Sequence, residues 1–355
     1  MMIGFARTFF SVCLVVALAG CTSLGPRSII RDRFDYSAAI SDSWKSQMLM
    51  NLVNIRYSDP PVFLDVASVI SQYELDTLAS LALTFTTANA QTAGGTVSYT
   101  DRPTITYNLL SGDKFARSLM TPIPPASIMS LIEAGWPAEL VLRLAVHSIN
   151  GIQNRSAGAL RGHAADPRFY RVIEALGRVQ RSGAVGIRVQ PEKKGEGAAI
   201  MVFASKTDES VEADRRLIRE TLGLDPQATE FSLAFGVVPR NDREIAILSR
   251  SMLDILAELS GNIEVPEAHV EEKRTFPTRE EDVFEGRKVQ SLMRILSRRE
   301  KPAEAFAAVQ NRGYWYWIDD RDFISKRVFS IIMFLFTLTE KPEKEGVPIV
   351  TIPTR

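Results

Sequence analysis

Cysteine is almost absent from this chain of 355 residues, which contains only Cys13 and Cys21. Because no cysteine follows position 21, the remainder of the chain has no disulfide bond, no cysteine nucleophile and no cysteine metal ligand. A cysteine-free body is compatible with an oxidising compartment, where proteins carry disulfides rather than reactive thiols. The sequence therefore excludes cysteine chemistry from everything beyond its first segment.

Histidine is nearly as scarce. His147, His163 and His269 are the only three, and they are too far apart in sequence for any two to share a helix face. The chain also lacks the Gly-x-Ser-x-Gly, His-Glu-x-x-His and glycine-rich phosphate-binding motifs. Gly195-x-Gly197 lies in an expected hairpin turn rather than between a strand and a helix. No complete catalytic motif is present, and we expect no cofactor.

Net charge is absent too, because 42 lysines and arginines balance 42 aspartates and glutamates. A neutral chain has no broad basic surface, so no nucleic-acid partner is expected. The hydrophobic share of 45% lies in the ordinary range for globular proteins. The composition thus predicts a globular body with a sizeable core.

The apolar stretch at the N-terminus is short. Residues 9–19 are fewer than the roughly 20 that a membrane-spanning helix needs, which argues against an uncleaved membrane anchor. The stretch follows Arg7 and runs into small residues, and this order of charged, apolar and small segments is that of a secretory signal. It ends at Leu18-Ala19-Gly20-Cys21.

This ending resembles the lipobox of bacterial lipoproteins. The resemblance implies that the thiol of Cys21 is diacylated, that the chain is cut before Cys21, and that the new amino group receives a third acyl chain. Each buried methylene contributes about 0.8 kcal/mol, so several chains attach a protein stably to a membrane. An ordinary secretory signal cut after Gly20 is the alternative, but it leaves Cys21 at this position as a coincidence.

The residue after the cysteine bears on which membrane a lipoprotein is attached to. It is Thr22 rather than the aspartate that commonly retains lipoproteins at the inner membrane of enteric bacteria. The resemblance therefore implies an outer-membrane address with the body facing the periplasm. Inner-membrane anchoring is the less favoured alternative.

Helical and strand patterns alternate along the chain and predict an α+β fold, with helices, small antiparallel or mixed sheets and room for two packed subdomains. The predicted regions are a signal peptide at 1–20, a tether at 21–34, an N-terminal α+β region at 35–155, an α+β module at 167–265, an exposed charged loop at 266–287 and a C-terminal segment at 288–355 that packs a buried helix on the body.

Individual elements follow from periodicity and from turn residues. Helices are predicted from Asp35 to about 57 and over 111–120, 126–134, 137–149, 167–181, 211–222, 241–261 and 323–338. Strands are predicted at 62–66, 81–86, 97–99, 104–107, 185–189, 200–204, 231–237 and 314–318. Gly94-Gly95 is interpreted as a hairpin loop, and the module is expected to place its helices on one face of its sheet.

Ser111 and Lys114 match the Ser-x-x-Lys motif of penicillin-binding enzymes, in which the lysine helps to activate a serine nucleophile. Ser148-Ile149-Asn150 resembles the second motif of those enzymes. The third motif is missing, because Lys206-Thr207-Asp208 has aspartate in place of the required glycine. The competing interpretation is that Ser111 caps a helix whose exposed face carries Lys114.

Asp319, Asp320 and Asp322 form the densest carboxylate cluster and follow Trp315-Tyr316-Trp317. Carboxylates can hold a hard cation such as Ca²⁺, and tryptophans beside them are suited to stacking on sugars. The alternative is that these acids cap the C-terminal helix, with Arg321 as an ionic partner.

The histidines are weaker candidates for functional residues. His147 is placed on the predicted helix beside Leu144, as a core or edge residue. His163, close in sequence to Arg155, Arg161 and Arg168, suggests either a small anion-binding patch or a solvated loop. Neither histidine completes a metal site.

Two functions follow. The favoured one is a non-enzymatic envelope lipoprotein, attached to the membrane through Cys21, that binds or assembles with an envelope protein through a surface such as residues 167–238. The alternative is an envelope hydrolase of peptidoglycan or glycans that uses Ser111 with Lys114, or the carboxylates near Asp320.

Overall fold

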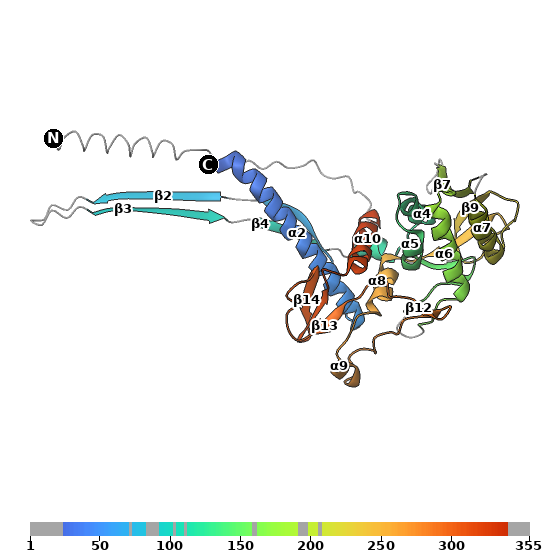
Figure 1. Cartoon of the computed structure of the whole chain (residues 1–355). Coiled ribbons are helices and arrows are strands. Elements are labelled where there is room, and N and C mark those ends of the chain that lie inside the picture. The colour runs from blue at the N-terminus through green and yellow to red at the C-terminus, as the bar shows by residue number, and fades with distance from the viewer. Residues whose placement is uncertain are drawn as a thin grey trace, which may run out of the picture. The chain divides into compact units, whose positions relative to one another are not determined.

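The computed structural model describes residues 24–70, 73–82, 92–101, 104–109, 112–157, 162–190, 198–204 and 208–339 (Figure 1). The fold class is α+β, as predicted. The chain divides into two compact units, Met1–Met48 and Leu49–Arg355. Within the described ranges, no helix combines the length and the apolar content that crossing a bilayer requires.

The first described helix, α2 (Leu24–Arg56), begins earlier than the predicted Asp35, so most of the predicted tether is helical. Gly25-Pro26 is the reason that the sequence indicated a tether, yet proline is compatible with the first turn of a helix. In the second unit, the last turns of α2 bury Leu49, Leu52 and Val53 completely. The helix ends before Pro60-Pro61, as predicted.

Two antiparallel ribbons follow α2 (Figure 1). Strand β1 (Leu64–Ile70) pairs with β4 (Thr104–Leu109), and β2 (Tyr73–Ala82) pairs with β3 (Thr92–Asp101). The prediction that Gly94-Gly95 forms the hairpin loop is wrong. Gly94 lies opposite Ser80 and Gly95 opposite Ala79, because the ladder of β2 and β3 continues through both glycines.

The largest sheet has six strands in the order β6-β5-β10-β9-β8-β7. Only β9 and β10 run parallel to each other. The strands are β5 (Val146–Ile149), β6 (Ile152–Gln153), β7 (Val185–Gln190), β8 (Ala198–Phe203), β9 (Glu230–Phe235) and β10 (Glu244–Ser249). This sheet therefore combines the predicted module with strands that precede it in the chain.

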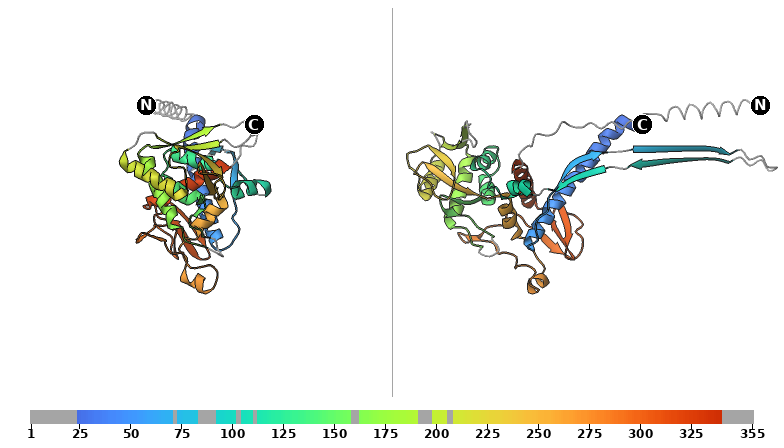
Figure 2. Two further views of the ribbon diagram at one scale, coloured as in Figure 1. Left: turned by 90° about the vertical axis from the view of Figure 1, so that its right-hand side faces the viewer. Right: turned by 180° about the vertical axis from the view of Figure 1, so that it is seen from behind.

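Helices cover one face of this sheet, as predicted, and α6 and α7 lie side by side on it (Figure 2). Met201 of β8 faces α4, α5 and α6, while Phe203 two residues later contacts arginines of α7. Because alternate strand residues share a face, all four helices lie on the same side. The helices are α4 (Pro125–Glu133), α5 (Ala138–Ala145), α6 (Pro167–Arg181) and α7 (Glu209–Leu222).

Two predicted helices are partly wrong. The helix predicted over 137–149 ends at Ala145, and β5 follows it; the helix predicted over 241–261 consists of β10 and then α8 (Met252–Ser260). Short apolar runs that are buried on both sides do not distinguish helix from strand by periodicity. Ser251 starts α8, because its side chain and that of Asp254 form a reciprocal capping box.

The rest of the second unit is built from short elements. These are α3 (Gly112–Met120), α9 (Glu267–Glu271), the pair β11 (Val283–Phe284) and β12 (Arg287–Lys288), and a three-stranded sheet of β13 (Leu296–Arg298), β15 (Tyr314–Ile318) and β14 (Ala307–Asn311). The exposed loop predicted over 266–287 is only partly exposed, because His269 and Phe284 are buried. Short buried segments of this kind have no periodicity to reveal them.

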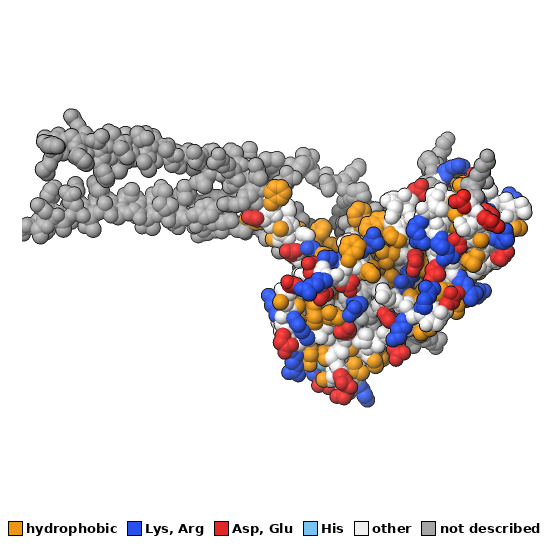
Figure 3. All heavy atoms as spheres, in the orientation of Figure 1, with side chains coloured by type: hydrophobic (Ala, Val, Ile, Leu, Met, Phe, Trp, Pro, Cys, Tyr) orange, Lys and Arg blue, Asp and Glu red, His pale blue; other side chains and the backbone are white. Residues whose placement is uncertain are grey.

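The last helix, α10 (Phe323–Thr339), was expected to be a buried core helix because its sequence is apolar on nearly every face. One side is buried, but Phe323, Ile324 and Phe334 are exposed. Figure 3 shows hydrophobic side chains gathered over α10. The prediction of burial therefore holds for one side of the helix only.

Candidate functional site

The lipidation and serine candidates lie mostly outside the described residues. Cys21 and Ser111 are both outside them, and Lys114 lies on α3. The second motif of the serine hypothesis has a structural role: the side chain of Asn150 donates to Leu222 O at 2.8 Å and accepts from Ala246 N at 2.7 Å. Asn150 therefore fastens the turn between β5 and β6.

The carboxylate cluster caps α10. Asp322 accepts hydrogen bonds from the backbone N–H and the hydroxyl of Ser325, at 3.0 and 2.8 Å. Asp320 lies 3.0 Å from the ammonium of Lys326, and Asp319 accepts from the backbone N–H of Arg321. No group of ligands able to hold a metal ion occurs among the described residues. The capping interpretation is confirmed for Asp322.

Arg321 was expected to pair with these aspartates, but its guanidinium pairs with Glu304 at 2.5 Å. The tryptophans beside the cluster also have partners: the guanidinium of Arg298 lies over Trp317 at 4.8 Å, and the ammonium of Lys301 over Trp315 at 5.4 Å. Each of these cation–π contacts occupies one face of its indole ring.

His147 lies on β5 rather than on the predicted helix, and its Nε2 is 3.7 Å from Asp254 Oδ2. This imidazole is the main reason that the pKa of Asp254 lies below its usual value; hydrogen bonds from Ser251 add to the shift. His163 is exposed, and of the arginines suggested for an anion-binding patch around it, Arg168 pairs with Asp166 and Arg155 is buried. Arg161 lies outside the described residues.

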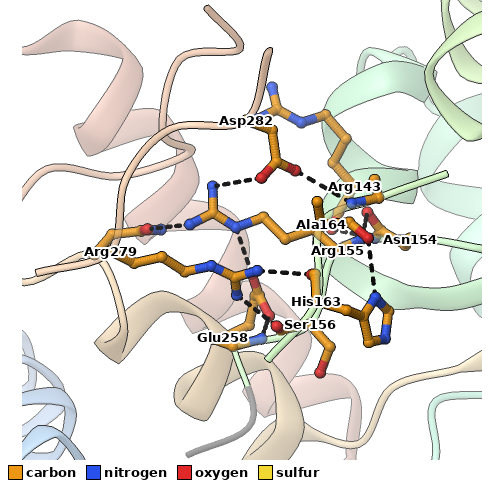
Figure 4. A network of polar contacts seen from close by, with 12 residues as sticks. Arg143, Asn154, Arg155, Ser156, His163, Ala164, Glu258, Arg279 and Asp282 are labelled. Carbon is orange, nitrogen blue, oxygen red and sulfur yellow. Dashed lines mark hydrogen bonds and ion pairs between the residues drawn. The ribbon is translucent and has the colours of Figure 1, made fainter. Parts of the chain in front are cut away.

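The most strongly built polar site was missed by the sequence reasoning. It is an arginine cluster, which we define as Arg155, Arg250, Arg279, Glu258 and Asp282 (Figure 4). Arg155, Arg250 and Glu258 are buried, and Arg279 donates to the carbonyls of Ser156 and His163. It joins the segment after β6, the segment between β10 and α8, α8 itself, and the segment before β11. Arg155 and Asp282 come from segments that the sequence indicated as loops, and nothing in a single sequence marks such arginines as buried.

Arg250 is the most deeply buried member, with 1% of its surface exposed. Its guanidinium donates to the carbonyls of Arg143 and Leu144, at 3.0 and 3.1 Å, and to the carbonyl of Arg155. Glu258 Oε2 lies 3.6 Å away. Burial lowers the pKa of Arg250, although an arginine remains protonated at any physiological pH. The charge is thus held by backbone carbonyls and one carboxylate.

The two carboxylates of the cluster are also engaged. Glu258 accepts from Ala157 N at 2.5 Å and lies 3.6 Å from Arg155 Nε (Figure 4). Asp282 accepts from the hydroxyl of Tyr170 at 2.9 Å and lies 4.0 Å from Arg155. Burial, together with Asp282, raises the pKa of Tyr170. Neither carboxylate is placed to act as an acid or a base toward a substrate.

The cavity beside the cluster is small. It measures about 20 Å³ and is bordered by Arg143, Asn154, Arg155, Tyr170, Glu258, Asn262, Ser291 and Leu292. A cavity of this size holds about one water molecule. The arginine cluster therefore fixes the packing of four chain segments and leaves no space for an organic substrate.

A second buried network joins Tyr57, His269 and Tyr316. The hydroxyl of Tyr57 lies 2.7 Å from His269 Nδ1 and 2.6 Å from the hydroxyl of Tyr316. If Tyr316 donates to Tyr57 and Tyr57 donates to Nδ1, both hydrogen bonds form with a neutral imidazole. Burial and the nearby Arg274 lower the pKa of His269, which agrees with a neutral ring.

This network predicts a pH dependence of stability. In the unfolded chain the histidine pKa is about 6.5, and folding lowers it, so the unfolded state binds more protons below that pH. We expect the free energy of unfolding to fall as the pH drops below about 6.5. His269→Gln should remove this dependence, and the exposed His163→Gln should not. Denaturant unfolding at pH 5 and pH 7.5 measures the free energy of unfolding of both variants. If it differs between the two pH values as much in His269→Gln as in the parent, the pH dependence does not come from His269.

A larger cleft lies between α4, α5, α6 and the edge of the sheet. It measures about 340 Å³, and most of its lining is apolar, including Met129, Leu142, Leu176, Val185 and Met201. Gln180 also borders it, but its amide already donates to Ile132 O and Trp136 O and accepts from Ala138 N. The volume is at the lower end for ligand sites. The cleft could accept an apolar group, and Glu133 is the one titratable residue among the described residues that line it.

No known protein family, curated protein or solved structure matches this chain.

Proposed function

We propose that this protein is a membrane-anchored envelope lipoprotein that acts as a non-enzymatic binding or assembly component. The anchor is Cys21, in the outer membrane, and the body faces the periplasm. The sequence supports the anchor, because a signal-like segment ends in a lipobox-like pattern at Cys21. The body supports the binding role through its exposed apolar surface rather than through any reactive group.

The observation that carries the binding role is a docking loop, which we define as residues 235–238 at the end of β9. Phe235, Val237 and Val238 are 54%, 47% and 73% exposed. Single exposed apolar side chains are ordinary, whereas several together mark interaction sites. The loop belongs to the module that the sequence already suggested as the docking surface.

The docking loop is held in place before any partner arrives. The backbone N–H of Gly236 donates to Ile247 O at 3.1 Å, which ties the loop to β10. A fixed loop loses less conformational entropy on binding than a flexible one. The partner that fits is an envelope protein with an apolar surface depression.

The hydrolase alternative gains no support from the described carboxylates. Asp322 is occupied as a helix cap, Asp320 pairs with Lys326, and Glu258 and Asp282 are buried in the arginine cluster. Its serine version depends on Ser111, which lies outside the described residues. The binding role is therefore the better supported of the two.

A photo-crosslinking amino acid at position 238 tests the proposal in intact cells. We expect an adduct with one envelope protein at this position and none at Arg216, which is exposed on α7. Phe235→Ser should reduce the adduct several-fold, because it removes an exposed apolar contact without touching the core. Adducts of equal yield at 216 and 238, or a yield unaffected by Phe235→Ser, would contradict a docking role for this loop.

A further inference from the structure

The ribbon formed by β2 and β3 has an unusual charge pattern. From Thr77 to Thr100 the chain contains no aspartate, glutamate, lysine or arginine, although these residues make up 24% of the whole sequence. Glu74, Asp76 and Asp101 all stand at one end of the ribbon. An uncharged stretch of this length indicates an environment that excludes charge.

The register of the ribbon separates two kinds of residues onto its two faces. Strand residues alternate between faces, and directly paired residues share a face. One face has mainly apolar positions: Tyr73, Leu75, Thr77, Ala79 and Leu81 of β2, with Ala93, Gly95, Val97, Tyr99 and Asp101 of β3. The other has mainly hydroxyl, glycine and acidic positions: Glu74, Asp76, Leu78, Ser80 and Ala82, with Thr92, Gly94, Thr96, Ser98 and Thr100.

The edges of the ribbon have no strand partners in the described part of the chain, where β2 and β3 pair only with each other. A two-stranded ribbon is marginally stable by itself in water. Its unpaired N–H and C=O groups are a template for further strands. The ribbon therefore needs both a cover for its apolar face and partners for its edges.

We propose that the ribbon is embedded in a lipid bilayer, with its apolar face against the hydrocarbon and its edges paired to the same ribbon of neighbouring copies of this chain. Each strand has ten residues, and strands that cross a bilayer have about 9–11. Tyr73 and Tyr99 belong to the apolar face at the charged end, where tyrosine favours the membrane interface.

Pairing between copies follows from the same physics. In hydrocarbon every backbone N–H and C=O must be hydrogen-bonded within the protein, so a single inserted ribbon would leave two rows of groups unpaired. A closed ring of copies leaves no unpaired edge. The proposal depends on neither the docking loop nor the acyl chains at Cys21, and it adds a membrane-inserting assembly to the proposed function.

Alternate-face labelling tests the insertion. The full chain with Cys13 and Cys21 replaced by alanine has no other thiol, so a cysteine at a chosen position carries the only environment-sensitive fluorophore. In vesicles of phosphatidylethanolamine and phosphatidylglycerol that contain nitroxide-labelled lipid, we expect several-fold stronger quenching for Val97→Cys than for Thr96→Cys. The pair Leu81→Cys and Ser80→Cys should repeat this contrast on β2, and exposed Asp208→Cys should show no quenching.

Equal quenching at positions 96 and 97, or none at either, would overturn the proposal. Because this chain cannot be acylated at Cys21, the result is independent of the lipid anchor. Energy transfer between donor- and acceptor-labelled Thr96→Cys copies then tests the pairing. We expect transfer in vesicles that is lost when unlabelled copies are added in excess; an absence of transfer would overturn the pairing between copies.

Discussion

Replacing Arg250 with methionine is expected to lower the free energy of unfolding by about 3–5 kcal/mol, because it breaks a buried ionic network. Three backbone carbonyls lose a hydrogen bond, although the carbonyl of Arg143 keeps one from the amide of Asn154, and Glu258 loses one of its two cationic neighbours. The loss of repulsion between Arg250 and Arg155 acts in the opposite direction. Each buried carbonyl left without a donor costs about 1–3 kcal/mol, so the loss of donors outweighs the relief of repulsion.

Denaturant unfolding followed by tryptophan fluorescence measures this effect. Arg243→Met is the matched control, since Arg243 also pairs with a carboxylate, that of Asp225, but its side chain is largely exposed. An exposed pair contributes about 0–1 kcal/mol, so the control should unfold nearly as the parent does. Arg250→Lys keeps the charge but not the planar fork and should fall between the two. Equal stabilities of Arg250→Met and Arg243→Met would show that the cluster is not a structural centre.

Replacing Cys21 with alanine is expected to abolish labelling by radioactive fatty acid and to release only part of the protein from membranes. Without acyl chains only the inserted ribbon of β2 and β3 holds the protein at the membrane, and it lacks the attachment that several acyl chains provide. Cell fractionation and acyl labelling measure the two consequences. The two measurements separate the two attachments, because labelling depends on Cys21 alone and incomplete release depends on the ribbon.

Cys13→Ala is the matched control, because Cys13 is the other cysteine of the chain and lies in the segment expected to be removed. This variant should keep both the acyl label and the membrane location. Acyl labelling that persists in Cys21→Ala would contradict the lipoprotein interpretation. Labelling lost equally in both variants would show that the loss is not specific to Cys21.

The sequence predicted those parts of the fold that have a clear period or clear caps. Residues 167–181 were predicted as a helix and form α6, where Asp166 caps the first turn and Pro167 begins it. Residues 314–318 were predicted as a strand and form β15. In both segments, local propensity and tertiary packing favour the same structure, so one sequence was sufficient.

The failures have a common physical cause. β5 has only four residues, and β10 is buried at nearly every position, so no alternation distinguishes either strand from a helix. Gly94 and Gly95 have turn-forming sequence but are held in β3 by long-range pairing. Arg155, Arg250 and Asp282 are charged residues, which are rarely buried unless paired, and their partners are distant in sequence. The predicted lipidation at Cys21 depends on a local pattern alone and stays a prediction.

The mass of the N-terminal peptide from protein purified out of bacterial membranes tests the central claim most directly. We expect a peptide that begins at Cys21, with a diacylglyceryl group on the thiol and a third acyl chain on the amino group. A peptide that begins at Met1, or one in which Cys21 has a free thiol, would contradict the proposed lipoprotein.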